Sequence, residues 1–210
     1  MYGFRNALRV MVVFSVFWLS GVNGAQAELV EIDFEAVDLQ GGGEIPNPYV
    51  LGNYDGYYFG NLGVYDRSIA EQDLGYSGYS NGATSGEQAA YQLWSMPSYI
   101  TRSTDRFDLF GGFFTAGWRE DVQLRVRGFR NYDNIAVYDE VFTIGTEALY
   151  LELDVLDVYA VTFETYGGVS AGFEYDGTNF IVDDLELFSI PAPAGAFLIT
   201  GGFFLRRRRA

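Results

Sequence analysis

The sequence predicts an all-β domain, a β-sandwich of the jelly-roll kind, and three observations lead to this prediction. Aromatic residues make up 18% of the 210 residues and glycines number 26, a combination typical of strands joined by many turns. Several segments alternate apolar and polar residues, as half-buried strands do. Between the two chain ends no long stretch keeps a helical period, while strand-like segments recur roughly every 10 to 15 residues, as in sandwiches.

The individual strands are predicted from these alternations. In VQLRVRGF, residues 122–129, valines and a leucine alternate with glutamine and arginines, so we expect one face of this strand to meet water. The run 106–118 is apolar almost throughout, which favours a central strand with a bulge or a close backbone approach at Gly111-Gly112. Further strands are expected at 28–37, 134–144, 157–167 and 179–188, the third of these ending in a turn at Gly167-Gly168.

Residues 38–104 have a different composition, rich in glycine, tyrosine, asparagine and serine. We expect a few short strands here, separated by long, ordered loops. Such loops gather at the ends of a sandwich, where binding sites usually lie. Asp55-Gly56 and Asp176-Gly177 are predicted to form hairpin turns.

Missing residue types and the charge exclude several functions. The chain has no cysteine and no histidine, so it has no disulfide, no thiolate metal site and no Ser-His or Cys-His dyad. The net charge is −15, and six of the 13 basic residues, all arginines, lie near the two ends, so the body between them carries −21. A body this acidic repels nucleic acid, which we do not expect as a partner, and attracts divalent cations.

Residues 1–27 have the layout of a secretory signal peptide. Arg5 and Arg9 form a positive region, residues 10–22 are apolar, and Ala25-Gln26-Ala27 places small residues at the two positions that a signal peptidase recognises. The alternative is a membrane anchor, for which the apolar run is short. We therefore expect an exported protein whose domain spans 28–189.

The segment 190–210, IPAPAGAFLITGGFFLRRRRA, closes the chain with a proline pair, a short apolar run and four arginines. Its uncharged run 194–205 spans roughly 18 Å as a helix at ~1.5 Å per residue, against a hydrocarbon core of ~30 Å. This length suits a transient stay in the membrane, with the arginines on the cytoplasmic side. The alternative is a terminal core strand with a basic tail.

In its order of elements this tail resembles the PEP-CTERM sorting signal. Pro191 and Pro193 match the two prolines, 197–205 matches the apolar segment, and the basic cluster follows, with Ala192 where the family usually has glutamate. That cluster consists of Arg206, Arg207, Arg208 and Arg209. The resemblance implies processing by an exosortase, a membrane-embedded enzyme of Gram-negative bacteria that make exopolysaccharide. It also implies an intermediate tethered to the inner membrane, and then delivery to the cell surface or the extracellular matrix.

The body of the chain is similar to many ectodomains of proteins with this signal. The similar segments are Asp-Phe-Glu at 33–35, Tyr-Tyr-Phe at 57–59, GFFTAGW at 112–118 and FIVDDL at 180–185. Those ectodomains resemble jelly-roll carbohydrate-binding modules, so the resemblance implies the same fold and makes a polysaccharide a candidate partner.

Four acids form a candidate calcium site. In the closing strand the apolar parity changes at Asp183-Asp184, which predicts a one-residue bulge that turns a carboxylate aside. Asp33 and Glu35 lie two apart on the opening strand, and the terminal strands of a jelly roll often lie side by side. The four carboxylates would then form an oxygen cluster suited to a structural Ca²⁺, the one cofactor considered. The alternative is acids solvated at strand edges.

Tryptophans are the candidates for stacking on sugar rings. Trp94 and Trp118, together with neighbouring tyrosines, have rings large enough for this, while the alternative for each is a place in the core. No P-loop, GxSxG motif, zinc-ligand spacing or EF-hand loop is present. The sequence therefore favours an exported protein that is not an enzyme, with a sugar-binding module and a glycan-active enzyme as the alternatives.

Overall fold

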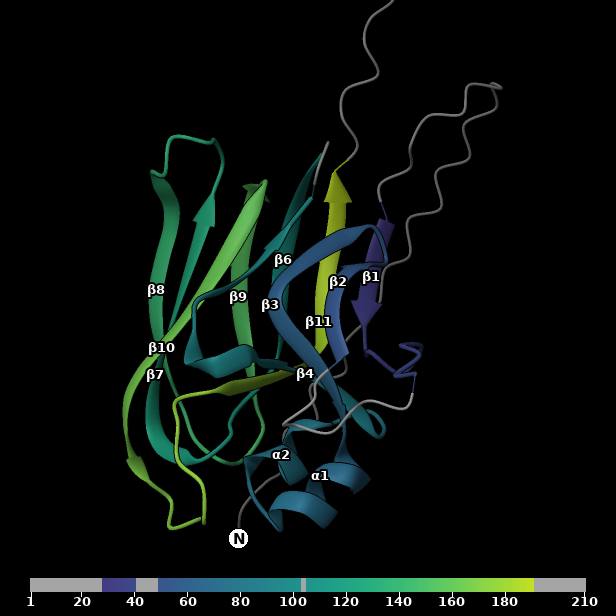
Figure 1. Cartoon of the computed structure of the whole chain (residues 1–210). Coiled ribbons are helices and arrows are strands. Elements are labelled where there is room, and N and C mark those ends of the chain that lie inside the picture. The colour runs from purple at the N-terminus through teal and green to yellow at the C-terminus, as the bar shows by residue number, and fades with distance from the viewer. Residues whose placement is uncertain (1–27, 41–48, 103–104, 191–210) are drawn as a thin grey trace, which may run out of the picture.

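The computed structural model describes residues 28–40, 49–102 and 105–190, so the predicted signal peptide and sorting segment lie outside the described residues. The described chain consists of eleven strands and three short helical segments (Figure 1). The strands are β1 (Glu28–Ile32), β2 (Tyr49–Tyr54), β3 (Tyr57–Asp66), β4 (Gln88–Gln92), β5 (Ser98–Thr101), β6 (Arg106–Ala116), β7 (Arg119–Phe129), β8 (Ala136–Ile144), β9 (Leu149–Val158), β10 (Ala160–Ser170) and β11 (Phe180–Ile190). The helices are α1 (Arg67–Leu74), α2 (Gly78–Gly82) and the 3₁₀ turn η1 (Leu93–Ser95).

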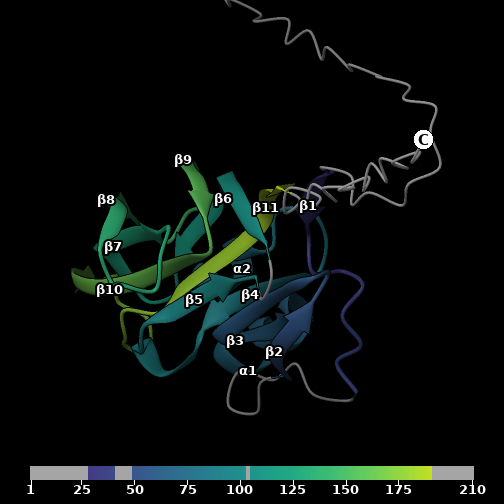
Figure 2. The same ribbon diagram turned by 90° about the horizontal axis from the view of Figure 1, so that it is seen from above.

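The strands form two facing layers that share strand β3. The first layer runs β8-β7-β10-β5-β3 with β2 on the far edge of β3, and the second runs β4-β11-β6-β9 with β1 beside β11. All pairs are antiparallel. Seen from above, the two layers lie opposite each other (Figure 2). The predicted all-β sandwich of jelly-roll type is confirmed.

Aromatic rings join the two layers across the core. Phe163 of β10 lies 5.9 Å from Phe114 of β6 and 5.7 Å from Phe180 of β11, measured between ring centroids. Nearer the other end, Tyr57 of β3 lies 5.4 Å from Phe107 of β6. All five side chains are almost completely buried. Burial of large rings of this kind supplies most of the driving force for a chain without disulfides.

The passage from one layer to the other occurs along β3. The first half of β3 pairs with β5 and the second half with β4, and the η1 turn separates those two strands. Asn61 stands at the change with a left-handed φ of 58°, and its side-chain amide donates to the carbonyls of Leu93, Met96 and Pro97. One side chain therefore fixes the shape of the η1 turn.

The predicted bulge in the closing strand is confirmed. From Asp183 to Glu186, β11 advances three residues while β6 advances two, and Asp184 adopts a left-handed φ of 49°. The extra residue lets Val182 and Leu185 both face the core. β6 has its own irregularity at Gly111, where a Cβ would come within 2.5 Å of the Leu151 carbonyl oxygen, so the close approach expected there is also found. β1 pairs with β11, as expected of the terminal strands.

A second, smaller core lies beneath the helices on the outer side of the second layer. Tyr79 of α2 is buried against Tyr65, Tyr91 and Trp118, at ring distances of 5.3, 5.5 and 5.0 Å. Trp118 is only 5% exposed and packs in this second core, the place that the alternative for this residue expects, and its role in stacking stays a prediction. No helix of the described residues is long and apolar enough to cross a membrane.

Several local predictions were wrong. Strand β9 was not predicted, although its residues alternate regularly between buried and exposed. Helices α1 and α2 lie in a region where only strands and loops were expected. Gly167-Gly168 does not end its strand, because both glycines take positive φ inside β10. Asp55-Gly56 forms the predicted hairpin turn between β2 and β3, but Asp176-Gly177 lies in a loop between strands that do not pair with each other.

We expect Gly78→Ala to destabilise the fold strongly. A Cβ at Gly78 would lie 1.9 Å from the carbonyl oxygen of Ala116, a backbone atom that cannot move without shifting β6. The cost should be about 3 kcal/mol or more of unfolding free energy, measured by urea denaturation.

Gly52→Ala is the matched control for this substitution. Gly52 has a φ of 61° but open space around its Cα, so alanine there should cost only about 1 kcal/mol from backbone strain. Equal losses for the two variants would contradict the close packing of α2 on β6.

Candidate functional site

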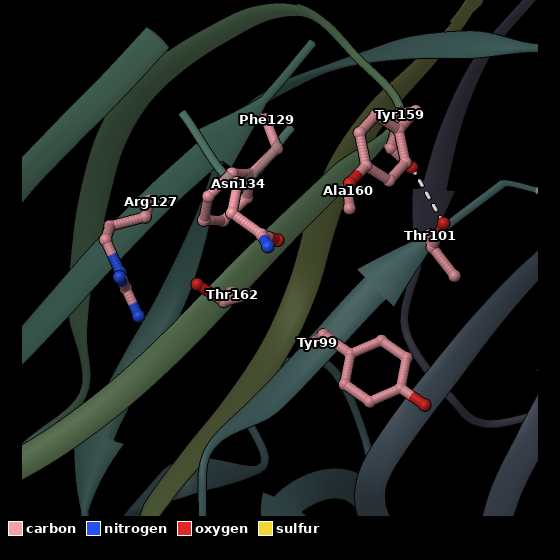
Figure 3. A pocket seen from close by; sticks show the side chains of 8 residues that line it. All are labelled: Tyr99, Thr101, Arg127, Phe129, Asn134, Tyr159, Ala160 and Thr162. Carbon is pink, nitrogen blue, oxygen red and sulfur yellow. Dashed lines mark hydrogen bonds between the residues drawn. The ribbon is translucent and has the colours of Figure 1, made fainter. Parts of the chain in front are cut away.

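The outer face of the first layer carries a hollow of about 480 Å³. Its floor is built from two rungs of the sheet across β7, β10 and β5. In one rung Thr162 stands between Arg127 and Tyr99, and in the next Ala160 stands between Phe129 and Thr101. Residues directly opposite each other in paired strands point to the same face, so all six side chains meet on one surface (Figure 3). The volume is in the usual range for small-molecule sites.

Tyr99 forms one end of the hollow, and its ring lies over a glycine. A Cβ on Gly60 of β3 would come within 2.1 Å of the Tyr99 ring, so only glycine leaves room for the ring on the β3 backbone. Tyr58 stacks beside it, with 5.9 Å between centroids and 30° between planes. Both rings remain about two-fifths exposed, which makes a broad, fixed aromatic surface.

Tyr159 forms the other end of the hollow (Figure 3). Its N–H donates to the Phe129 carbonyl at 2.9 Å, and its carbonyl accepts from Thr101 Oγ1 at 2.8 Å, so both neighbouring strands fix its backbone. The ring lies 4.3 Å from that of Tyr132, which is 80% exposed. Partial burial, first of all, raises the pKa of both Tyr99 and Tyr159, so these phenols stay neutral hydrogen-bonding groups at ordinary pH.

Some polar atoms in the floor of the hollow have no hydrogen-bond partner in the described structure. Arg127 pairs through Nη2 with Glu164, but its Nε has no acceptor among the described residues. The hydroxyl of Thr162 likewise has no partner within the described part of the chain. Asn134 adds an amide from the loop between β7 and β8. The hollow thus combines aromatic rings with the exposed Asn134 amide, while the unpaired Nε of Arg127 and hydroxyl of Thr162 are buried in its floor, and its lining residues include no carboxylate.

The four predicted calcium ligands come together only in part. Glu35 Oε1 accepts from the N–H groups of Glu87 and Gln88 at 2.8 and 2.6 Å. Asp33 instead closes a local turn by accepting from the Glu35 N–H, because β1 ends at Ile32 and the two acids do not share a strand face. Within the described ranges no group of three or more acidic side chains is arranged to hold a metal ion.

Asp183 is the buried acid of this region. Its Oδ2 accepts from the N–H groups of Thr84 and Ser85 at 2.7 and 3.2 Å and from the Thr84 hydroxyl at 3.0 Å. Asp184 accepts from the same hydroxyl at 2.8 Å. Glu35 and Asp183 therefore fasten the 84–88 loop to the terminal strands. These donors occupy some of the predicted ligand oxygens, whereas Oδ1 of Asp184 has no hydrogen-bond partner among the described residues, and the calcium site stays a prediction.

Burial raises the pKa of Asp183 to about 6, although the Thr84 N–H lowers it and the neighbouring charge of Asp184 raises it further. A raised pKa in a carboxyl group can mark a catalytic acid. Asp183 is fully buried beneath the 84–88 loop, however, and does not line the hollow. The shift reflects the cost of burying a charge in a structural position.

Trp94, the other predicted stacking residue, is 72% exposed. It lies in η1 with a left-handed φ of 52°, and the same value at Ser95 makes this turn doubly unusual. Asn61 holds the turn in this shape. Trp94 does not line the hollow, and its role in stacking stays a prediction.

The residues that line the hollow were not predicted. The alternation in 122–129 indicated that Arg127 faces water, but nothing in the sequence indicated which residues lie beside it. That depends on the register of β10 with β7 and β5, which joins positions 28 to 63 residues apart. The local sequence offers only a weak signal: Tyr99 lies two residues before Thr101, and Tyr159 directly precedes Ala160.

Comparison with known proteins gives only loose structural likenesses. No protein-family model and no curated protein matches the chain. The TmCBM61 module in complex with β-1,4-galactotriose is 12% identical with a TM-score of 0.33, covering 66% of this chain and 92% of that one. The K2 cleaved adhesin domain of Lys-gingipain is 12% identical with a TM-score of 0.42, covering 77% and 98%. A CBM4 module is 10% identical with a TM-score of 0.32, covering 70% and 97%. The fold assignment rests on the strand order and the core described above.

The pH dependence of stability should reveal the buried state of Asp183. Between pH 4 and 6 the folded chain keeps a proton on Asp183 that the unfolded chain, with a pKa near 3.8, has lost. The contribution of Asp183 to stability therefore falls as pH rises from 4 to 6, by about 3 kcal/mol for a shift of this size, and is constant above. Urea denaturation of the wild type and Asp183→Asn at several pH values should show this difference.

Asp176→Asn is the control with the opposite sign. The Arg119 guanidinium lowers the pKa of Asp176, so the contribution of this exposed acid is present near neutral pH and is lost on acidification. A wild-type minus Asp183→Asn difference that is flat from pH 4 to 7 would contradict the buried, raised pKa.

Proposed function

We propose that the described domain is a carbohydrate-binding module and that the hollow on the outer face of the first layer is its binding site. The observation that carries the proposal is the pair of tyrosines, Tyr99 and Tyr159, at the two ends of a hollow whose lining also includes the polar side chains of Arg127, Asn134 and Thr162. A pyranose ring has C–H groups on its faces and hydroxyls around its edge. A site that suits it therefore needs an aromatic face and hydrogen-bonding groups beside it.

The arrangement supports binding of an extended chain rather than a single small molecule. The hollow is open to solvent along the sheet, and aromatic rings continue past both of its ends, Tyr58 beside Tyr99 and Tyr132 beside Tyr159. Because the rings are held by neighbouring strands and by Gly60, little conformational entropy is lost when a ligand stacks on them.

We propose binding without catalysis. Glycoside hydrolysis needs two carboxyl groups on either side of the scissile bond. None of the residues that line this hollow is acidic, and the carboxylate of Glu164 is paired with Arg127. These features favour a binding module over a glycan-active enzyme.

Tyr99→Ala should weaken polysaccharide binding about tenfold, since it removes one stacking surface worth about 1.4 kcal/mol. Gly60→Ala should weaken it as well, because the new Cβ would displace the Tyr99 ring while the phenol itself remains. Affinity gel electrophoresis against a panel of soluble polysaccharides, followed by calorimetry on those that retard the protein, measures both effects.

Tyr76→Ala is the matched control. Tyr76 is a 66% exposed tyrosine between α1 and α2, on the helices that cover the second layer. It should leave binding unchanged. If the Tyr99 and Tyr76 variants bind equally well, or if no polysaccharide in the panel retards the wild type, the proposed function is wrong.

We further propose that the module is exported and then sorted by its C-terminal segment. What supports this is the sequence: the signal-peptide layout of residues 1–27, Pro191 and Pro193, and the arginine cluster at 206–209. By its resemblance to PEP-CTERM proteins, an exosortase-type enzyme would process the tail and release the module to the surface or matrix, where a polysaccharide would be at hand.

The mature protein should lack its terminal arginines. Fractionation of native cells with mass spectrometry of the C-terminal peptide should detect a chain that ends before Arg206, in the surface or extracellular fraction. Recovery of the intact RRRRA end on released protein would contradict sorting by this segment.

A further inference from the structure

A second hollow of about 250 Å³ adjoins the first. Three arginines line it, Arg102, Arg106 and Arg130. The other lining residues are Asp105, Asn131, Tyr132 and Tyr159. Tyr159 lines both hollows, so they are consecutive parts of one surface. Arg102 directly follows β5 and Arg106 begins β6, while Arg130 lies in the loop after β7.

This concentration of positive charge contrasts with the rest of the molecule. The whole chain has a net charge of −15, and the described residues contain only seven arginines. Four of the seven line the two hollows. The remaining three have their own acidic partners: Arg67 with Glu87, Arg119 with Asp176 and Arg125 with Asp139.

The second hollow has three arginines but one acid in its lining, Asp105, with Asp157 beside it. Arg106 and Arg130 share one carboxylate, that of Asp157, at 2.8 and 3.0 Å. Arg102 has no ion pair with any acid of the described residues, and its Nη1 is buried without an acceptor. Its guanidinium lies 5.3 Å from the centre of the Tyr57 ring, which positions it. An unpaired buried guanidinium nitrogen costs stability unless an acceptor reaches it.

The chemistry of the hollow favours a carboxylate as the missing acceptor. Guanidinium groups bind carboxylates readily, and within the same cluster one oxygen of Asp157, Oδ2, already pairs with Nη1 of Arg106 and Nε of Arg130. A carboxylate brought by a ligand would meet the three guanidinium groups that line the hollow, those of Arg102, Arg106 and Arg130. The acidic body repels polyanions at long range, so only a ligand seated within this hollow gains from it.

We infer that the second hollow is a subsite for the carboxylate of a uronic acid, so that the polysaccharide bound by this module is an acidic one. The inference rests on the proposed function and names its substrate class. A sugar stacked on Tyr159 presents its neighbouring residue to Arg102, Arg106 and Arg130, while the next sugars lie along the first hollow toward Tyr99.

The test compares each acidic polymer with its own neutral form. Polygalacturonate and alginate, and the same polymers after reduction of their carboxyl groups to alcohols, are titrated into the purified protein at fixed ionic strength, with dextran sulfate as a second anion. The acidic forms should bind at least tenfold more tightly than the reduced ones. Arg102→Gln should remove most of that difference. Arg67→Gln, which removes an arginine of α1 that is paired with Glu87, should not change it.

The outcomes separate this inference from the proposed function. If the reduced polymers bind as well as the acidic ones and Tyr99→Ala weakens both, the module binds glycans but the carboxylate subsite is wrong. If dextran sulfate binds as tightly as the uronates and depends equally on Arg102, the hollow is a general anion site and the uronate assignment is wrong. If no polymer binds and Tyr99→Ala changes nothing, both proposals fail.

Discussion

The sandwich depends on the turn between β4 and β5, and the side-chain amide of Asn61 fixes this turn by hydrogen bonds. Its Nδ2 donates to the carbonyls of Leu93, Met96 and Pro97 and so fixes the turn that sends β4 into one layer and β5 into the other. Its neighbour Gly60 receives the Tyr99 ring on the same strand. Two adjacent residues of β3 thus determine both where the layers separate and where an aromatic surface can lie flat on the first of them.

Charge is used differently on the two layers. Beside the second layer, Glu35 and Asp183 accept hydrogen bonds from backbone N–H groups and so hold the 84–88 loop. The raised pKa of Asp183 results from its burial there. On the first layer and its adjoining edge, arginines act at the surface, and the number of acids beside them is too small to neutralise each one separately. The net charge of −15 does not indicate that most arginines of the described residues lie on one side of the molecule.

The sequence was informative where structure is local, and less so where it depends on register. Alternation identified the strand at 122–129, and the change of parity at Asp183-Asp184 identified the bulge of β11. The pairing of β10 with β5 and β7 depends on three separate segments of the chain, and no one of them indicates it. The residues that line the hollow could therefore not be predicted. The burial of Trp118 could not be predicted for the same reason. The apolar sequence of its strand does not indicate that α2 covers the outer face there.

The position of β11 has a consequence for the order in which the chain acquires its structure. This last strand lies in the middle of its layer, with β6 along one edge and β4 and β1 along the other. Residues 28–32 have no partner strand until residues 185–189 arrive. Contacts of such sequence separation form late, because a long loop must close first. The second layer is therefore completed only when almost the whole domain is available, an order that would suit the export proposed above if the chain crosses the membrane unfolded, from its N-terminus onward.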